Sequence, residues 1–142
     1  MLPKLLILAA FTAATLLAAD PVKEQDALMR SLERLVPQNA AHADGYRSRI
    51  AFVRTDQGIK VTLTEAGPDR TVTQTFIMPG DCAKTEDCVF KRTDGIVEFH
   101  GPGGGDYYYN LGPYDVSVAH EIVDKLNRLK VSASAQHNPP KQ

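Results

Sequence analysis

The sequence has no tryptophan, only two cysteines and almost no excess of charge of either sign. Its 142 residues include 16 Lys and Arg against 17 Asp and Glu, so the formal net charge is −1. Proteins that neutralise nucleic-acid phosphates need a basic surface, and this balance therefore argues against nucleic-acid binding. At 43%, hydrophobic residues are too abundant for a disordered chain, and the length suits one domain.

Long apolar runs are also missing, except at the start of the chain. There a lysine in "MLPK" is followed by the uncharged run "LLILAAFTAATLLAA". This run is shorter than the roughly 20 residues that cross a bilayer, and it ends in small residues, as a cleaved signal peptide does. We expect cleavage between Ala19 and Asp20, with Thr12–Ala14 as a rival site. A single membrane anchor is the alternative. Residues 1–19 are thus interpreted as a signal peptide, and the mature protein as periplasmic or secreted.

The two cysteines, Cys82 and Cys88, lie close together in "GDCAKTEDCVF". In an exported chain an even number of cysteines predicts a disulfide. The spacing C-x5-C is not that of a redox motif, and no neighbouring histidine pair completes a zinc site. We expect a structural disulfide here and no metal or other cofactor.

Helical periodicity at both ends of the mature chain encloses segments of alternating polarity. Asp20 is a suitable N-cap for the first helix, Pro21 suits its first turn, and Pro37 ends it. Its apolar stripe is Leu28, Leu32, Leu35 and Val36, and that of the second helix is Ala119, Ile122, Val123, Leu126 and Leu129. The segments between them that read as strands are "YRSRIAFVRT", "GIKVTLTE", "TVTQTFIM", "CVFKR", "IVEFH" and "DYYYNL".

These elements predict an α+β fold. We expect one antiparallel sheet of five or six strands, with the N- and C-terminal helices packed on one face. Residues 20–131 form this single domain, and residues 132–142 are predicted to be a flexible tail.

The other face of that sheet is expected to be polar and rich in threonine. Its candidate contact residues are Lys60, Thr62, Thr73, Glu98 and His100. An ordinary solvated sheet face is the plain alternative.

Signs of catalysis are sparse. His100 and Glu98 share a strand face, so a histidine oriented by a carboxylate is geometrically feasible. No nucleophile motif accompanies the pair, and the constellation that nucleophilic catalysis requires is incomplete. The sequence therefore predicts a protein that is not an enzyme, with His100 and Glu98 as the weak exception.

The stretch "HGPGGGDYYYN" is the most unusual in the chain. A phosphate loop would need a helix and usually a lysine after the glycines, whereas here a strand-forming tyrosine run follows. Glycines provide a loop without side chains, and tyrosines are favoured at protein contacts. One interpretation is a turn before a core strand; the other is a partner-binding loop. The loop residues are Gly103, Gly104, Gly105, Asp106, Tyr107, Tyr108 and Tyr109.

In build, the chain is similar to small exported α+β proteins that inhibit hydrolases, including periplasmic lysozyme inhibitors and immunity proteins. We therefore expect a non-catalytic binding protein with a protein partner in the cell envelope, such as an inhibitor or immunity protein for a hydrolase or toxin. One alternative is a small-ligand-binding envelope protein with an apolar pocket lined by Phe52, Phe76, Phe99 and Tyr109. Another is an envelope structural or assembly factor.

Overall fold

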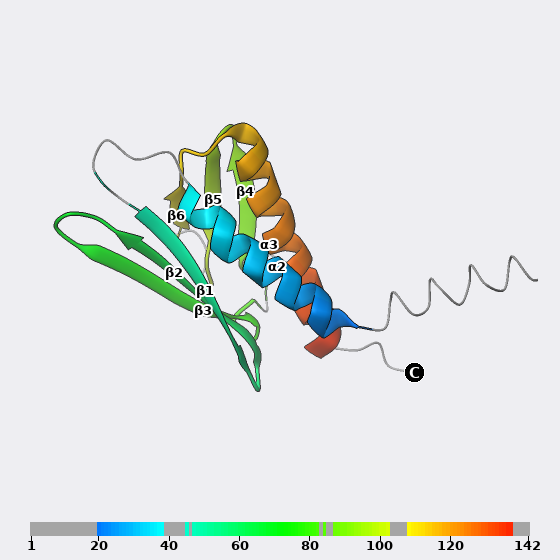
Figure 1. Ribbon diagram of the computed structural model, residues 1–142. Helices are drawn as coiled ribbons and strands as arrows, with labels where there is room; N and C mark the ends of the chain where they lie inside the picture. Colours follow the sequence, from blue (N-terminus) through cyan, green and yellow to red (C-terminus); the bar gives the residue numbers. More distant parts are fainter. Residues whose placement is uncertain are drawn as a thin grey trace, which may run out of the picture.

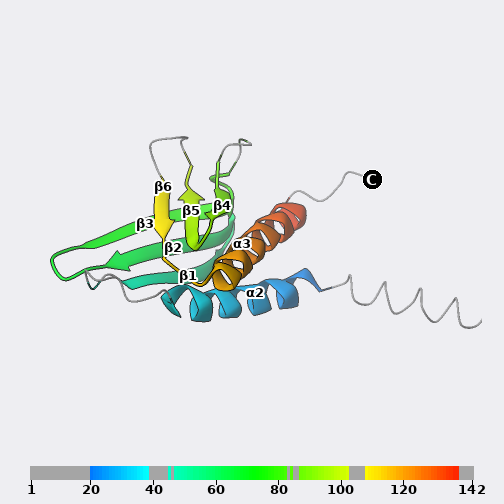
Figure 2. The same ribbon diagram turned by 90° about the horizontal axis from the view of Figure 1, so that it is seen from above.

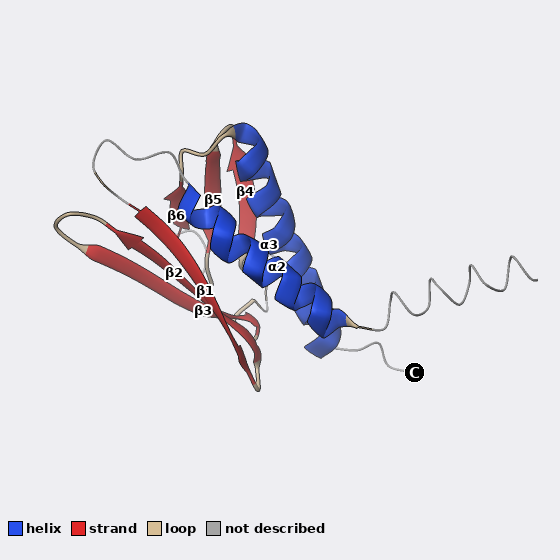
Figure 3. Ribbon diagram, viewed as in Figure 1, coloured by secondary structure: helices blue, strands red, loops and turns tan. Residues whose placement is uncertain are grey.

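The computed structural model describes residues 20–38, 45, 47–82, 84, 87–102 and 108–137. The predicted signal peptide, residues 1–19, and the end of the predicted tail, residues 138–142, lie outside the described residues. Within those ranges, no helix is both long enough and apolar enough to cross a membrane. The described elements follow the predicted order, with a helix, six strands and a second helix (Figure 3).

Helix α2, Pro21–Leu35, begins where the sequence predicts. Asp20 caps it, because the Asp20 carboxylate accepts a hydrogen bond of 3.0 Å from the backbone N–H of Lys23. A 3₁₀ turn, Val36–Gln38, ends the helix at the predicted proline. The predicted apolar stripe is buried in full: Leu28, Leu32, Leu35 and Val36.

Strands β1 (Arg47–Thr55), β2 (Gly58–Ala66) and β3 (Thr71–Pro79) form an antiparallel sheet with β2 in the middle. Gly58 opens β2 with a φ of +130°, and a Cβ there would collide with the carbonyl oxygen of Met78 on β3. The tight turn between β1 and β2 therefore requires glycine at this position. The alternation predicted for β2 is confirmed, since its inward apolar side chains are buried: Ile59, Val61 and Leu63.

The structure corrects the expectation of a single sheet. Strands β4 (Val89–Thr93), β5 (Ile96–His100) and β6 (Tyr108–Leu111) form a second antiparallel sheet, and β3 and β4 are not paired. The α+β class is confirmed. The division follows from the link between β3 and β4, which spans residues 80–88 and contains the disulfide. A tight turn would have placed β4 beside β3, and this longer link does not.

Both helices and the second sheet lie on the same side of the first sheet (Figure 1). Helix α2 packs against β1, and α3, Val116–His137, contacts α2, both β2 and β3 of the first sheet, and β4 and β5 of the second. Figure 2 shows α3 between α2 and the second sheet. No described element covers the other side of the first sheet (Figure 1).

Aromatic side chains join the two sheets in the core. Phe76 of β3 meets Phe99 of β5 edge to face, with ring centroids 5.0 Å apart, and Phe90 of β4 lies 4.9 Å from the same Phe99 ring. Four of the five predicted stripe residues of α3 are fully buried beside them, and Val123 is half-buried. The buried four are Ala119, Ile122, Leu126 and Leu129. Residues 132–137, predicted to belong to the tail, continue this helix.

Candidate binding surfaces

The first candidate is the exposed face of the first sheet, opposite the helices (Figure 1). Successive side chains of a strand point to opposite faces, and the buried ones mark the inner side. The remaining side chains of β1–β3, defined here as the outer face, carry three cations, six threonines and no carboxylate. The outer face comprises Arg47, Arg49, Ala51, Val53 and Thr55 of β1; Lys60, Thr62, Thr64 and Ala66 of β2; and Thr71, Thr73, Thr75, Ile77 and Pro79 of β3.

The register aligns the outer face in rows across the three strands. Arg49, Thr64 and Thr73 form one row. In the next row the hydroxyl of Thr75 donates to that of Thr62 at 3.4 Å. None of the three cations forms an ion pair with a described carboxylate.

Two of the five predicted contact residues lie elsewhere. Lys60, Thr62 and Thr73 belong to the outer face, but Glu98 and His100 belong to β5 of the second sheet. The prediction of one shared face required one continuous sheet, and the division into two sheets separates these residues (Figure 1).

The side chains of His100 and Glu98 lie close together on the second sheet. His100 Nε2 lies 3.7 Å from Glu98 Oε2, and both side chains are about one-third exposed, at 31% and 35%. The hydroxyl of Thr93 donates to the other Glu98 oxygen at 3.4 Å. Among the residues that the structure describes, no three His, Cys, Asp or Glu side chains are grouped to hold a metal ion.

The predicted partner-binding loop is described only at its end. Residues 103–107 lie outside the described residues. Tyr108 and Tyr109 open β6, where Tyr108 stands opposite His100 and Tyr109 opposite Phe99. Tyr109 is half-buried and packs against the core. The strand predicted after the glycines is therefore present.

A groove of about 310 Å³ opens beside β3. Strand β3 contributes Thr73, Gln74 and Thr75 to its lining, and the side of the second sheet contributes Pro102 and Tyr109. The groove is therefore open to solvent and has walls from both sheets.

Gln74 points to the inner side and lies against Gly101 so closely that a Cβ on Gly101 would collide with the Gln74 amide nitrogen. The carbonyl oxygen of the Gln74 side chain is buried and accepts no hydrogen bond from any described residue. An unsatisfied buried acceptor costs about 1–3 kcal/mol of stability.

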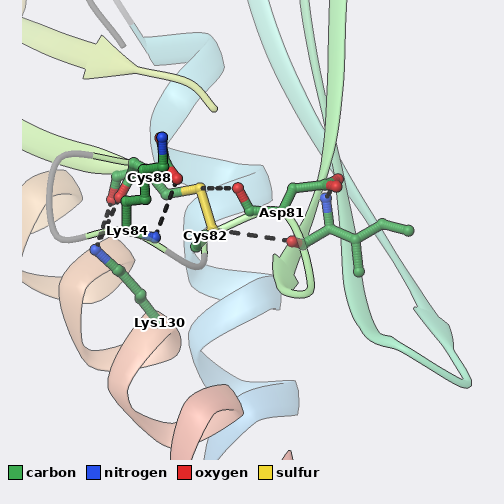
Figure 4. Close-up of a disulfide and its surroundings, with 7 residues drawn as sticks. Asp81, Cys82, Lys84, Cys88 and Lys130 are labelled. Carbon is green, nitrogen blue, oxygen red and sulfur yellow. Dashed lines mark hydrogen bonds between the residues drawn. A yellow bond between two sulfur atoms is a disulfide. The ribbon is translucent and has the colours of Figure 1, made fainter. Parts of the chain in front are cut away.

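The predicted disulfide is present in the structure. Cys82 and Cys88 are bonded, with their Cα atoms 5.5 Å apart. Lys130 reaches this loop from α3 and donates to the backbone carbonyl oxygens of Asp87 and Cys88, at 3.2 and 3.0 Å (Figure 4). These bonds attach the link between the sheets to the C-terminal helix.

Sequence reasoning missed a polar network that joins both helices to β1. Gln25 of α2 is fully buried, and its amide nitrogen donates to Ser132 and Gln136 of α3, at 3.0 Å each. Its carbonyl oxygen accepts from Arg54 at 2.7 Å, and Arg54 also donates to Asp26 at 2.7 Å. The only signal in the sequence is a glutamine on the apolar stripe of α2, three residues before the first leucine of that stripe.

Tyr114, just before α3, is a second buried polar residue that the sequence reasoning missed. Its hydroxyl donates a hydrogen bond of 2.8 Å to the carbonyl oxygen of Val36, at the end of α2. Burial raises the pKa of Tyr114 well above the ordinary tyrosine value, and the negative charge of Glu65 adds to the rise. The hydroxyl therefore remains a neutral donor at physiological pH.

No family model, curated protein or solved structure matches this chain. The fold itself defines an α+β protein in which two antiparallel three-stranded sheets and two helices enclose one core.

Proposed function

We propose that this chain is an exported, non-catalytic binding protein that attaches to a protein partner through its outer face. The observation that carries the proposal is the charge of that face. It has three cations and no carboxylate, although the whole chain has a net charge of −1. Complementary charge steers association and selects partners, so the partner should present an acidic surface.

The chemistry of the outer face suits protein contact. Arginine is enriched at protein interfaces, and Arg47 and Arg49 both lie on this face. Val53 adds apolar surface because it is 60% exposed. The threonine rows supply hydroxyl groups that both donate and accept hydrogen bonds.

The more specific proposal is an inhibitor or immunity protein that binds a hydrolase or toxin in the cell envelope. The apolar start of the chain, its small size and the single disulfide support this role. A ligand pocket between sheet and helix finds less support, because Phe76 and Phe99 contact each other. An envelope assembly factor would use the same outer face and is separated from an inhibitor by what the partner does.

A crosslinking capture with matched charge reversals tests the proposal. The full chain, with its own leader and a C-terminal tag, is expressed in its native cell envelope, and captured proteins are identified by mass spectrometry. The test variant combines Arg49→Glu with Lys60→Glu. The control combines Lys23→Glu with Arg30→Glu, two exposed cations of α2.

We expect one stoichiometric partner with the wild type and with the control, and a loss of about tenfold or more with the test variant. Equal capture by both variants would refute the role of the outer face. The absence of any stoichiometric protein partner would refute the proposed function itself.

A further inference from the structure

The open edge of β3 is a second candidate site, and its chemistry differs from that of the outer face. β3 is an end strand of the first sheet, and end strands expose backbone N–H and C=O groups with which another extended chain can pair. Charged residues commonly protect such edges. β1, the other end strand, carries Arg47, Arg49 and Arg54, whereas β3, "TVTQTFIMP", carries no charge.

The turn between β1 and β2 determines which backbone groups of β3 face the open side. In a two-residue hairpin the closing pair is hydrogen-bonded, and here that pair is Thr55 and Gly58. The backbone N–H and C=O groups of successive residues in a strand point to opposite sides. Gly58 points to β1, so Val61, three residues later, directs its backbone groups to β3, where it pairs with Phe76. Thr75, the residue before Phe76, therefore directs its N–H and C=O away from β2.

An independent contact leads to the same assignment. Ile77 donates its backbone N–H to the Asp81 carboxylate at 2.7 Å, and its carbonyl oxygen accepts from the Asp81 N–H at 2.7 Å. The backbone groups of Ile77 thus face the open side, and at a period of two so do those of Thr75 and Thr73. Asp81 closes the edge at Ile77. No hydrogen bond from another described residue reaches the outward backbone groups of Thr73 and Thr75.

The groove lies at this same stretch. Thr73 and Thr75 line it, and Pro102 and Tyr109 approach it from the second sheet. A strand added to β3 would lie about 4.8 Å from it, at the groove that those two side chains help to line. Since they flank the edge, the space suits one extended chain better than the sheet of a second copy. Tyr109, which is half-buried, would meet side chains on the inner side of the added strand.

We propose that the backbone of Thr73 and Thr75 binds an extended peptide segment of the protein partner as a fourth strand of the first sheet. Two N–H and two C=O groups are available to it, and main-chain pairing of this kind provides affinity with little dependence on sequence. The alternate side chains of the bound segment, which contact those of β3, determine which peptide sequences are preferred. We expect threonine or valine beside the two threonines and an apolar residue toward Tyr109. The inference rests on the proposed function in one respect, namely that the partner is a protein.

The test uses a short peptide of alternating threonine and valine, with a lysine at each end for solubility. Hydrogen exchange of the backbone amides is followed by NMR in the full mature chain with its disulfide intact. We expect the peptide to slow exchange at Thr73 and Thr75 by about tenfold or more, and to leave Gln74 and Phe76 unchanged because β2 already bonds them. The same peptide, N-methylated so that its backbone cannot donate, is the matched control and should not bind.

Two protein variants sharpen this result. Thr75→Pro removes an outward N–H while keeping the pairing with β2, and should weaken peptide binding by about tenfold or more. The outer-face variant Arg49→Glu with Lys60→Glu should bind the peptide as the wild type does. If Thr75→Pro loses the peptide but still captures the envelope partner as the wild type does, this inference is refuted and the proposed function stands.

Three further results would overturn the proposal. The first is the absence of saturable peptide binding, or protection at residues other than the two threonines. The second is slow exchange at Thr73 and Thr75 in the free protein, which would mean that the edge is already covered. The third is protection that grows with protein concentration in the absence of peptide, because a second copy would then occupy the edge.

Discussion

Replacing Gln25 and Gln74 by methionine should change the stability of this protein in opposite directions. Methionine keeps the length and much of the shape of glutamine and removes its polar amide. Gln25 is fully buried and makes three hydrogen bonds, whereas the buried carbonyl oxygen of Gln74 makes none with the described residues. The same substitution therefore removes satisfied polar groups at one site and an unsatisfied one at the other.

The loss at Gln25 can be estimated bond by bond. A buried hydrogen bond contributes about 1 kcal/mol net, and a bond to a charged group such as Arg54 contributes somewhat more. The partners Arg54, Ser132 and Gln136 are all partly exposed, so water replaces part of what each loses. We expect Gln25→Met to lower the free energy of unfolding by about 2 kcal/mol.

The gain at Gln74 comes from a penalty that disappears. An unsatisfied buried acceptor costs about 1–3 kcal/mol, and the thioether of methionine has no comparable demand for a donor. The side chain lies against Gly101, so some repacking offsets the gain. We expect Gln74→Met to raise the free energy of unfolding by about 1 kcal/mol.

Urea denaturation of the protein with its disulfide intact measures both changes. Gln57→Met, in the exposed turn between β1 and β2, is the matched control and should change stability by less than about 0.5 kcal/mol. The reasoning would be refuted if Gln74→Met were less stable than the wild type. It would equally be refuted if Gln25→Met had no effect beyond that of the control.

Three other residue-level predictions follow from the same structure. Replacing Cys82 and Cys88 by serine should lower the free energy of unfolding by about 2 kcal/mol, since the disulfide closes a short loop; chemical denaturation measures it, and an unchanged midpoint would contradict it. Gly58→Ala should lower the free energy of unfolding by about 2 kcal/mol, because φ is positive at this position and a Cβ has no room. Gly80→Ala is its control and should be nearly neutral when the two variants are compared by thermal unfolding. Tyr114→Phe should lower the free energy of unfolding by about 1 kcal/mol through loss of a buried hydrogen bond. Because burial raises the pKa of Tyr114, folding favours its neutral form, and this contribution is present below about pH 10 and declines above it. Ultraviolet titration in which no tyrosine resists ionisation until the protein unfolds would contradict that assignment.

Both helices and the alternation within the strands could be predicted because they depend on local patterns. The apolar stripe of α2 and the cap at Asp20 lie within a few turns of chain. Likewise, the turn between β4 and β5 depends on its own residues, since Asp94 has a φ of +52°, which aspartate tolerates better than most residues. The disulfide was predictable because the chain has only two cysteines, which lie close together and allow a single pairing.

The candidate sites were predicted only in part. Lys60, Thr62 and Thr73 share the outer face because the alternation in β2 and β3 places them there. Glu98 and His100 were assigned to the same face on the assumption of a continuous sheet, and no local pattern reveals that β4 leaves the first sheet. The Gln25 network was missed because its partners lie on β1 and on the distant end of α3.

By itself, the sequence determined the apolar stripes of the two helices, the alternation in the strands and the α+β class, because the period of apolar residues reflects local backbone geometry. Only the tertiary structure decided that the strands form two sheets, that the outer face holds cations without carboxylates, and that no described residue pairs with the edge of β3 at Thr73 and Thr75. These features depend on which strands pair across the chain. Pairing is made by backbone hydrogen bonds that every residue except proline can form, so side-chain patterns do not reveal it.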